Sequence, residues 1–199
     1  MLLADNKAGA FGIVGLRSTH MANDSGNYQV VIPEIELRQR IVSLGRQISE
    51  DFKGRSILCV GVLENGFLFA ADLVRAITCD VSCQFVMPYV HEIHEGNVTT
   101  KQIFYAPEID VQGRHILICE GILSTGQTTE FLRRNFQARG AASVSVCSLL
   151  DRESDRRVDL QSTYWGFRVG PQQLAGFGLG APALERNLPF IFAAPDMRA

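Results

Sequence analysis

The chain has 199 residues, 46% of them hydrophobic, and a formal net charge of −2. That length and hydrophobic content suffice for one α/β domain with a full core, and they exclude a chain that is disordered throughout. The near-neutral charge gives no electrostatic basis for binding nucleic acid or an anionic membrane, so neither is expected as a partner. No apolar run has the length of a membrane-spanning helix and no signal-peptide pattern is present, so a cytoplasmic location is expected.

The cysteines predict neither a disulfide framework nor a zinc site. Their number is odd and no Cys-x-x-Cys pair occurs among them. Three of the five lie inside apolar runs, where a free thiol behaves as a small hydrophobic side chain. We therefore expect reduced cysteines in the core, at Cys59, Cys119 and Cys147.

Residues 1–26 are rich in Gly, Ala, Asn, Asp and Ser without a sustained period, which predicts a flexible N-terminal extension ahead of one domain at 27–199. Within that domain, short apolar runs predict strands and apolar residues at helical spacing predict helices. The expected strands are Tyr28–Ile32, Ile57–Leu63, Val81–Val90, Lys101–Tyr105, His115–Cys119, Ala142–Leu150, Thr163–Val169, Ala175–Leu179 and Phe190–Ala193, the last at a sheet edge. The expected helices are Glu34–Phe52, Phe67–Ile77 and one containing Phe131–Phe136.

Strands that alternate with helices at this spacing indicate βαβ units and a parallel, doubly wound sheet. In such sheets ligands bind beyond the carboxyl ends of the strands. Three strand ends should therefore meet at one edge, with the segments Glu64–Gly66, Glu120–Thr128 and Asp151–Arg152.

The most informative stretch runs from Arg114 to Glu130. A buried strand ends at the acidic Glu120, and Ser124–Thr128 then supplies hydroxyl groups and a glycine just before a helix. Such a loop suits an anion, because the free backbone N–H groups and the helix dipole both point at it. An ordinary strand-to-helix turn capped by Ser or Thr has the same spacing, so the pattern alone leaves both interpretations open.

Two polar segments have plain alternatives to a functional role. The segment Tyr89–Thr100 contains His91, Glu92, His94 and Glu95, which could ligate a divalent metal, but the spacing is not His-Glu-x-x-His and a solvated, mobile loop is the expected reading. The charged run 152–157 is typical of a solvated surface, although Arg152 directly follows a strand and can face the site. No Gly-x-Gly-x-x-Gly follows a strand, so no dinucleotide cofactor is expected.

From about Val30 to Ile191 the chain resembles the hypoxanthine(-guanine) phosphoribosyltransferases, which are type I phosphoribosyltransferases. The resemblance is carried by the segments Val31–Ile41, Val60–Ile77, Glu120–Thr128, Leu149–Arg152, Trp165–Val169, Gly176–Leu179 and Arg186–Ile191. It implies a parallel sheet with a small hood made from the terminal segments. It also implies Mg²⁺ as cofactor, phosphoribosyl pyrophosphate or a purine nucleotide as ligand, and a homodimer or homotetramer.

The resemblance also implies roles for single residues. Phosphate binding falls to Ser124, Thr125, Gly126, Gln127 and Thr128. The catalytic positions are Glu120, which is also the remaining metal ligand, and Ser124, which stands where the family has the Asp that transfers a proton. The pyrophosphate residues are Glu64, Asn65 and Arg186, and the purine-binding residues are Arg152, Leu174 and Ala175, with Leu174 matched to the family's stacking aromatic.

Several family carboxylates are replaced in this chain. Gly121 and Gly180 stand at acidic positions linked to the metal, and Ser124 is too weak a base to replace an Asp well. Glu64 places a negative charge where pyrophosphate leaves. Phosphate binding is thus kept while metal binding and proton transfer are weakened. The sequence predicts a slow purine phosphoribosyltransferase of the salvage type, and the alternative is an inactive relative that binds a purine nucleotide as a sensor or regulatory subunit.

Overall fold

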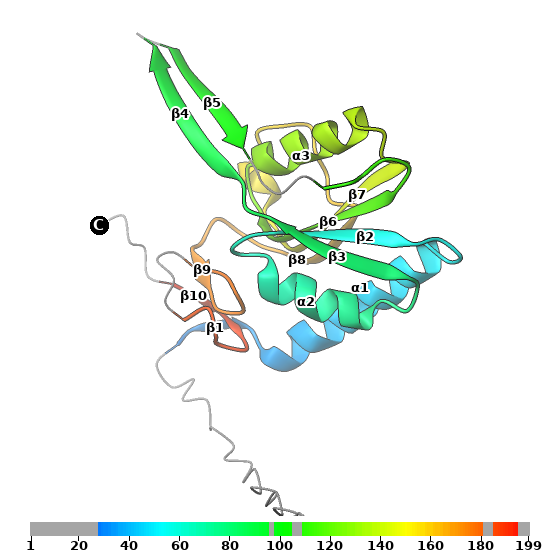
Figure 1. The fold of residues 1–199 in the computed structure, drawn as a ribbon. Helices are drawn as coiled ribbons and strands as arrows, with labels where there is room; N and C mark the ends of the chain where they lie inside the picture. The colour runs from blue at the N-terminus through cyan, green and yellow to red at the C-terminus, as the bar shows by residue number, and fades with distance from the viewer. Residues whose placement is uncertain (1–27, 96–97, 105–108, 181–184, 195–199) are drawn as a thin grey trace, which may run out of the picture.

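A five-stranded parallel sheet forms the centre of the molecule in the computed structural model, which describes residues 28–95, 98–104, 109–180 and 185–194 (Figure 1). The predicted extension at 1–26 lies outside these residues. The strand order is β3-β2-β6-β7-β8. The strands are β2 (Ile57–Val62), β3 (Val81–Val86), β6 (His115–Leu123), β7 (Ser143–Asp151) and β8 (Tyr164–Arg168). All four neighbouring pairs are parallel, so the predicted fold class is confirmed.

Helices cover both faces of this sheet (Figure 1). Helices α1 (Glu34–Asp51) and α2 (Phe67–Ala76) lie on one face, and α3 (Gln127–Ala138) lies on the other. A short 3-10 helix, η2 (Glu153–Asp155), follows β7. Among the described residues, no helix combines the length and apolar character needed to cross a membrane.

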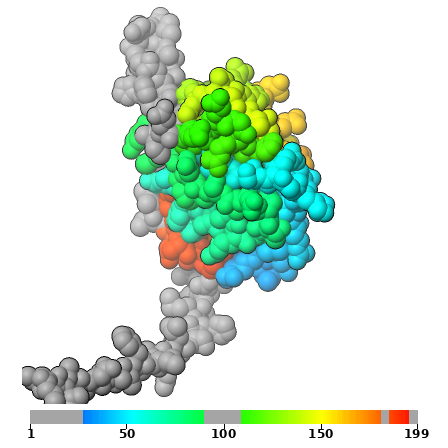
Figure 2. Space-filling model, turned by 45° about the vertical axis from the view of Figure 1, so that its right-hand side comes forward, coloured from blue at the N-terminus to red at the C-terminus, as the bar shows by residue number. Residues whose placement is uncertain are grey.

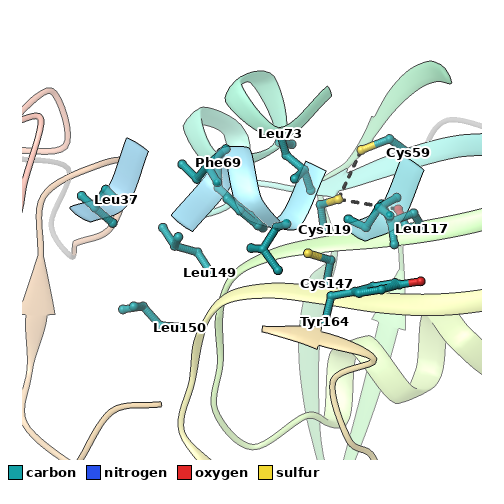
Figure 3. Close-up of a cluster of buried hydrophobic side chains, with 14 of the residues drawn as sticks. Leu37, Cys59, Phe69, Leu73, Leu117, Cys119, Cys147, Leu149, Leu150 and Tyr164 are labelled. Atoms are coloured by element: carbon teal, nitrogen blue, oxygen red, sulfur yellow. Dashed lines mark hydrogen bonds between the residues drawn. The ribbon is translucent and has the colours of Figure 1, made fainter. Parts of the chain in front are cut away.

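The central strands read as continuous apolar runs because both of their faces are buried. In β2, Leu58 and Val60 join the cluster under α3, while Cys59 joins the cluster under α1 and α2. Cys119 and Cys147 also pack in the cluster under α1 and α2 (Figure 3). The Sγ atoms of Cys59 and Cys119 lie 3.2 Å apart, and all three cysteines are free thiols in the core, as predicted.

The chain ends combine in a second, smaller sheet. Strand β10 (Ile191–Ala193) pairs on one side with β1 (Val30–Ile32) and on the other with β9 (Leu174–Ala175), antiparallel in both cases. Figure 2 shows the C-terminal part of this hood, in red, beside the blue start of α1. The prediction that Phe190–Ala193 closes an edge was wrong: β10 is the middle strand, because β1 supplies a partner from the other end of the chain.

The segment after β3 differs from its prediction. One strand was expected over Val81–Val90, but β3 ends at Val86, just before Pro88, which has no N–H to donate to a ladder. The mobile loop expected over Tyr89–Thr100 instead contains β4 (Tyr89–Glu95) and the start of β5 (Val98–Phe104), which pair antiparallel as a hairpin. The hairpin projects from the central sheet (Figure 1). The Thr, Val and Ile residues of β5 favour a strand over a loop. This preference was missed in the sequence because the segment is polar as a whole.

Gly45 of α1 packs closely against Ala76 of α2 on the first face, and its replacement tests this packing. A Cβ on Gly45 would lie 2.5 Å from Ala76 Cβ and 2.6 Å from Ala76 O. Although alanine favours helix, we expect Gly45→Ala to lower the free energy of unfolding by roughly 1–3 kcal/mol in urea titrations, because the helices must separate. Ser43→Ala, on the exposed side of α1, should stay within about 0.5 kcal/mol of the wild type. A Gly45→Ala variant as stable as the wild type would contradict this packing.

Candidate active site

The carboxyl ends of β2, β6 and β7 meet at one edge of the central sheet, as the sequence predicted. A Cβ on Gly66, after β2, would lie 3.0 Å from Cys119 O and 3.3 Å from Gly121 N of β6. The loop after β7 joins them, because Arg152 N donates a hydrogen bond of 3.0 Å to Leu123 O. Residues far apart in the sequence therefore form one surface.

The loop between β6 and α3 has the geometry of an anion site. Gly126 precedes the helix in the left-handed conformation, with φ of +76°, and no side chain caps the first helical N–H groups. A pocket of about 210 Å³ opens here, lined in part by Glu120, Ser124, Thr125, Gly126, Thr128 and Thr129. Because the Ser124 hydroxyl is engaged elsewhere, the interpretation of an ordinary capped turn does not describe this loop.

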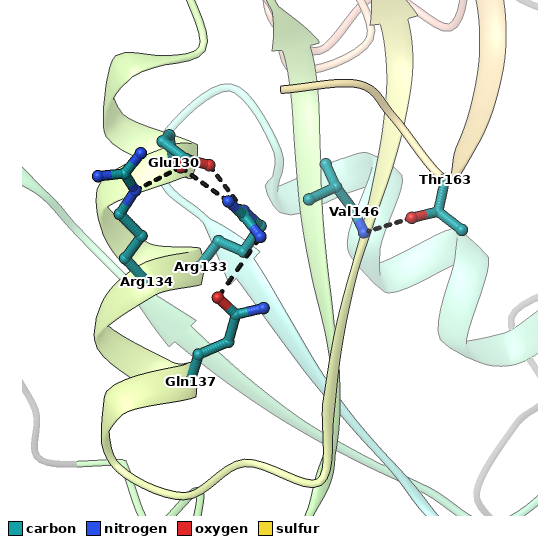
Figure 4. A network of polar contacts seen from close by, with 6 residues as sticks. All are labelled: Glu130, Arg133, Arg134, Gln137, Val146 and Thr163. Atoms are coloured by element: carbon teal, nitrogen blue, oxygen red, sulfur yellow. Dashed lines mark hydrogen bonds and ion pairs between the residues drawn. The ribbon is translucent and has the colours of Figure 1, made fainter. Parts of the chain in front are cut away.

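A negative charge in the first turn of α3 would oppose anion binding, and the structure offsets it. Glu130 is buried, and it accepts hydrogen bonds from Arg133 Nε at 2.6 Å and from Arg134 Nε at 2.5 Å (Figure 4). The bond from Arg133 is the main cause that holds the pKa of Glu130 below its ordinary value. Two cations thus accompany one carboxylate, and the helix N-terminus keeps its positive potential.

Glu120 lies at the floor of this pocket. The residue is 8% exposed, and its carboxylate accepts a hydrogen bond of 2.6 Å from Thr129 Oγ1. Burial raises the pKa of Glu120 to about 7, and the hydrogen bond from Thr129 opposes that rise only in part. A carboxyl with this pKa changes its charge near neutral pH, which suits contact with a polar or cationic group.

The acidic position next to Glu120 is closed by backbone. A Cβ on Gly121 would lie 2.1 Å from Asn65 O, so no side chain fits there in this arrangement. Gly180 offers only its carbonyl oxygen, which accepts a hydrogen bond of 2.7 Å from Arg186. Within the ranges that the structure describes, no group of three His, Cys, Asp or Glu side chains could hold a metal ion. The described side chains of this edge therefore do not form a metal site by themselves, and a Mg²⁺ ion here would depend on one or two carboxylates together with substrate phosphates.

The three predicted pyrophosphate residues come together at this edge. Arg186 Nη2 lies 3.0 Å from Glu64 Oε2, and Asn65 follows Glu64 in the loop that packs against β6. Glu64 is the more exposed partner, with 56% of its side chain accessible against 17% for Arg186. The carboxylate that the sequence placed near the leaving group is thus an ion-pair partner of the nearby cation.

The predicted purine-binding residues differ in how much of each could contact a base. Arg152 is buried, and its Nη2 donates a hydrogen bond of 2.6 Å to Gln172 O. Leu174 and Ala175 are buried in β9, and Leu174 packs into the cluster under α1 and α2. At 8% exposure the Leu174 side chain offers little surface to a ring. Arg152 is therefore the polar group of this set that remains for recognising a base.

Unpartnered polar atoms mark the same edge. Over the described residues, three buried side-chain nitrogen or oxygen atoms lack a hydrogen-bond partner: Asn65 Oδ1, Arg152 Nε and Arg186 Nε. Buried polar atoms are normally satisfied, so such exceptions require an explanation. Asn65 and Arg152 follow β2 and β7, and Arg186 is paired with Glu64 beside them, which is the clustering that a site for a polar ligand predicts.

Sequence reasoning missed the network that holds the phosphate loop from the side of β7. Ser124 Oγ donates a hydrogen bond of 2.9 Å to Asp155 Oδ2, and Ser124 O accepts one of 2.9 Å from Arg156 Nη1. Arg156 is also paired with the buried Asp151. These residues belong to the charged run that we interpreted as solvated surface. Only its position directly after a strand, which drew attention to Arg152, hinted at this role.

Comparison with known proteins identifies the class. Residues 35–182 match the family model of the phosphoribosyl transferase domain, so the chain belongs to the phosphoribosyltransferase family. The resemblance to the hypoxanthine(-guanine) members is confirmed by curated relatives. The hypoxanthine-guanine phosphoribosyltransferase of Streptococcus pneumoniae is 33% identical over 165 residues, covering 82% of this chain and 91% of that protein. The hypoxanthine phosphoribosyltransferase of Escherichia coli is 32% identical over 167 residues, with 82% and 93% covered.

Solved structures agree with this assignment. A crystal structure of a hypoxanthine phosphoribosyltransferase from Staphylococcus aureus is similar with a TM-score of 0.79 at 27% identity, covering 88% of this chain and 96% of that one. A hypoxanthine-guanine phosphoribosyltransferase from Bacillus anthracis gives a TM-score of 0.75 at 31% identity, covering 83% and 95%. The similarity thus extends over both the sheet and the surrounding elements.

The raised pKa of Glu120 predicts how stability depends on pH. Because the folded-state value of about 7 exceeds the ordinary 4.5, the stabilising contribution is complete below 4.5 and is lost as the pH rises through 7. Glu120→Gln should match the wild type at pH 4 and exceed its free energy of unfolding at pH 8 by about 3 kcal/mol. Urea unfolding at the two pH values measures this.

The buried Glu130 provides a control of opposite sign. Because its pKa is lowered, Glu130→Gln should lose stability at pH 8 relative to the wild type and lose less at pH 3. If Glu120→Gln showed the same difference from the wild type at pH 4 and pH 8, the carboxyl of Glu120 would not have a raised pKa.

Proposed function

We propose that this chain is a slow purine phosphoribosyltransferase of the salvage type. It transfers the phosphoribosyl group of phosphoribosyl pyrophosphate to a ring nitrogen of hypoxanthine or a related 6-oxopurine, and it releases pyrophosphate. The observation that carries the proposal is the meeting, at one sheet edge, of an uncapped helix N-terminus with three buried polar atoms that lack partners. The relatives named above supply the reaction, since both act on hypoxanthine by name.

The side chains and backbone suggest a division of tasks. The N–H groups at the start of α3 can hold the 5′-phosphate, because an uncapped N-terminus with an intact dipole favours an anion. The guanidinium of Arg152 can donate to the 6-oxo group of the base, and its unpartnered Nε can reach a second acceptor. Arg186 can donate to the pyrophosphate oxygens as charge develops there. Each role uses a donor that the protein itself leaves unsatisfied or uncapped.

The same geometry supports a low rate. Asn65 O occupies the space of a side chain at Gly121, and Glu64 competes with pyrophosphate for Arg186. General acid–base catalysis by a well-placed carboxylate is typically worth about 10²–10⁴-fold, and position 124 carries a hydroxyl in its place. Substrate binding is therefore better provided for than the chemical step.

A direct assay tests the proposal. The purified full chain is incubated with magnesium chloride, phosphoribosyl pyrophosphate and one base at a time, and nucleotide is measured by chromatography. We expect product from hypoxanthine, guanine or xanthine and little from adenine, because a guanidinium donates to a 6-oxo group but not to an amino group. If no base gave product while calorimetry detected binding of inosine monophosphate, the chain would be a nucleotide-binding relative and not an enzyme.

The ion pair between Glu64 and Arg186 predicts a variant with tighter substrate binding. Glu64→Gln frees the guanidinium and removes a negative charge beside the pyrophosphate, so the KM for phosphoribosyl pyrophosphate should fall roughly fivefold. Steady-state kinetics at fixed base concentration measures it. Glu34→Gln is the matched control, since it removes an exposed carboxylate paired with Arg38 on α1, and it should leave KM unchanged. A KM that rises in Glu64→Gln would show that the carboxylate assists binding.

A further inference from the structure

The proposed reaction leaves one proton without an assigned acceptor. When a purine ring nitrogen bonds to C1′ of the ribose, the C1′–O bond to pyrophosphate breaks and its electron pair leaves with pyrophosphate. A neutral base must then lose one N–H proton, and a positioned base speeds that loss. The inference below rests on the proposed function. The carboxylates described at this edge include those of Glu64, Glu120, Asp151 and Asp155.

Three of these four carboxylates are engaged in other ways. Glu64 is paired with Arg186, and the buried Asp151 is paired with Arg156. Glu120 accepts the hydroxyl hydrogen of Thr129, and burial keeps much of it protonated near neutral pH. Each of these three carboxylates thus has a partner other than Ser124.

Asp155 differs in its partner. It lies on η2, with 36% of its side chain exposed, and its Oδ2 accepts a hydrogen bond of 2.9 Å from Ser124 Oγ. Ser124 lines the pocket at the phosphate loop. A hydroxyl that donates its own hydrogen keeps lone pairs with which it accepts another. The pair thus links a wall of the pocket to a carboxylate that reaches solvent.

We propose that Asp155 is a positioning residue that acts through Ser124 and supplies the carboxylate that position 124 lacks. The Ser124 oxygen takes the purine N–H proton while the Ser124 hydroxyl proton passes to Asp155 Oδ2. The N–H bond breaks, its electron pair forms the bond to C1′ by way of the ring, and the Ser124 hydroxyl is restored. Asp155 ends as a carboxylic acid, and it loses the proton to water.

The charges around Asp155 are compatible with this role. Arg152 Nη1 lies 3.5 Å from Asp155 Oδ2, and Arg156 Nη1 donates to Ser124 O. The hydroxyl of Ser154 is 3.2 Å from Asp155 Oδ1. The hydrogen bond from Ser124 is the main cause that lowers the pKa of Asp155, so the carboxylate is ionised at neutral pH.

The first test compares two neighbouring variants. In Asp155→Asn the amide oxygen can still accept from Ser124, but it cannot take up a proton. We expect kcat to fall about 10²-fold or more, with the KM for phosphoribosyl pyrophosphate and the calorimetric affinity for inosine monophosphate within about twofold of the wild type. Ser154→Ala removes the hydrogen bond to the other carboxylate oxygen and should leave kcat within about twofold.

The second test moves the carboxylate. Adding Ser124→Asp to Asp155→Asn places a base in direct reach of the purine, and the new amide at 155 can donate to it. We expect this double variant to recover at least about tenfold in kcat over Asp155→Asn alone. A purely structural role of Asp155 predicts no such recovery.

The outcomes are separable. Wild-type kcat in Asp155→Asn would overturn the inference while leaving the proposed function intact. A loss of kcat that is accompanied by lost nucleotide affinity and not recovered by Ser124→Asp would also overturn it, and would assign Asp155 to holding Arg152. Absence of turnover in the wild type, measured first, would overturn the proposed function and this inference together.

Discussion

The close approach of two backbones, at Asn65 after β2 and Gly121 within β6, is the constraint around which the site is arranged. No side chain fits at Gly121, because a Cβ would lie 2.1 Å from Asn65 O, and a Cβ on Gly66 would lie 3.0 Å from Cys119 O. This contact places the loop after β2 against β6, and the same loop carries Glu64, which is paired with Arg186. One packing interaction thus joins the pyrophosphate residues to the phosphate loop, and it replaces an acidic side chain with a main-chain carbonyl.

A site built this way keeps its binding functions separate from its chemical ones. The phosphate loop depends on backbone geometry at Gly126 and on the arginines that offset Glu130, and neither requires a carboxylate. The chemical step depends on acids, and the described acids lie in ion pairs or hydrogen bonds with Arg186, Thr129, Arg156 or Ser124. Loss of a family carboxylate therefore need not abolish substrate binding, and a carboxylate from a neighbouring loop can approach the same position.

The sequence predicted what depends on local pattern. Apolar runs such as Ile57–Leu63 identified the sheet, and the Ser124–Thr128 loop indicated a candidate anion site where the structure has a pocket, because both signals lie within a few residues. It could not predict interactions between distant segments. That Asn65 fills the space beside Gly121 depends on two loops meeting, and the central place of β10 depends on pairing with β1. Asp155 was hidden in a charged run whose local pattern is that of exposed surface.

The hood sheet has a consequence for how the protein is made. Its middle strand, β10, comes from the end of the chain and joins β1 to β9, so the sheet has no centre until residue 193 has been synthesised. The five parallel strands are complete by residue 168, so the central sheet and the phosphate loop can assemble while the chain still emerges from the ribosome. The nascent protein would then form its central sheet first, and β9, which carries Leu174 and Ala175, would gain its sheet partner only after β10 has been synthesised.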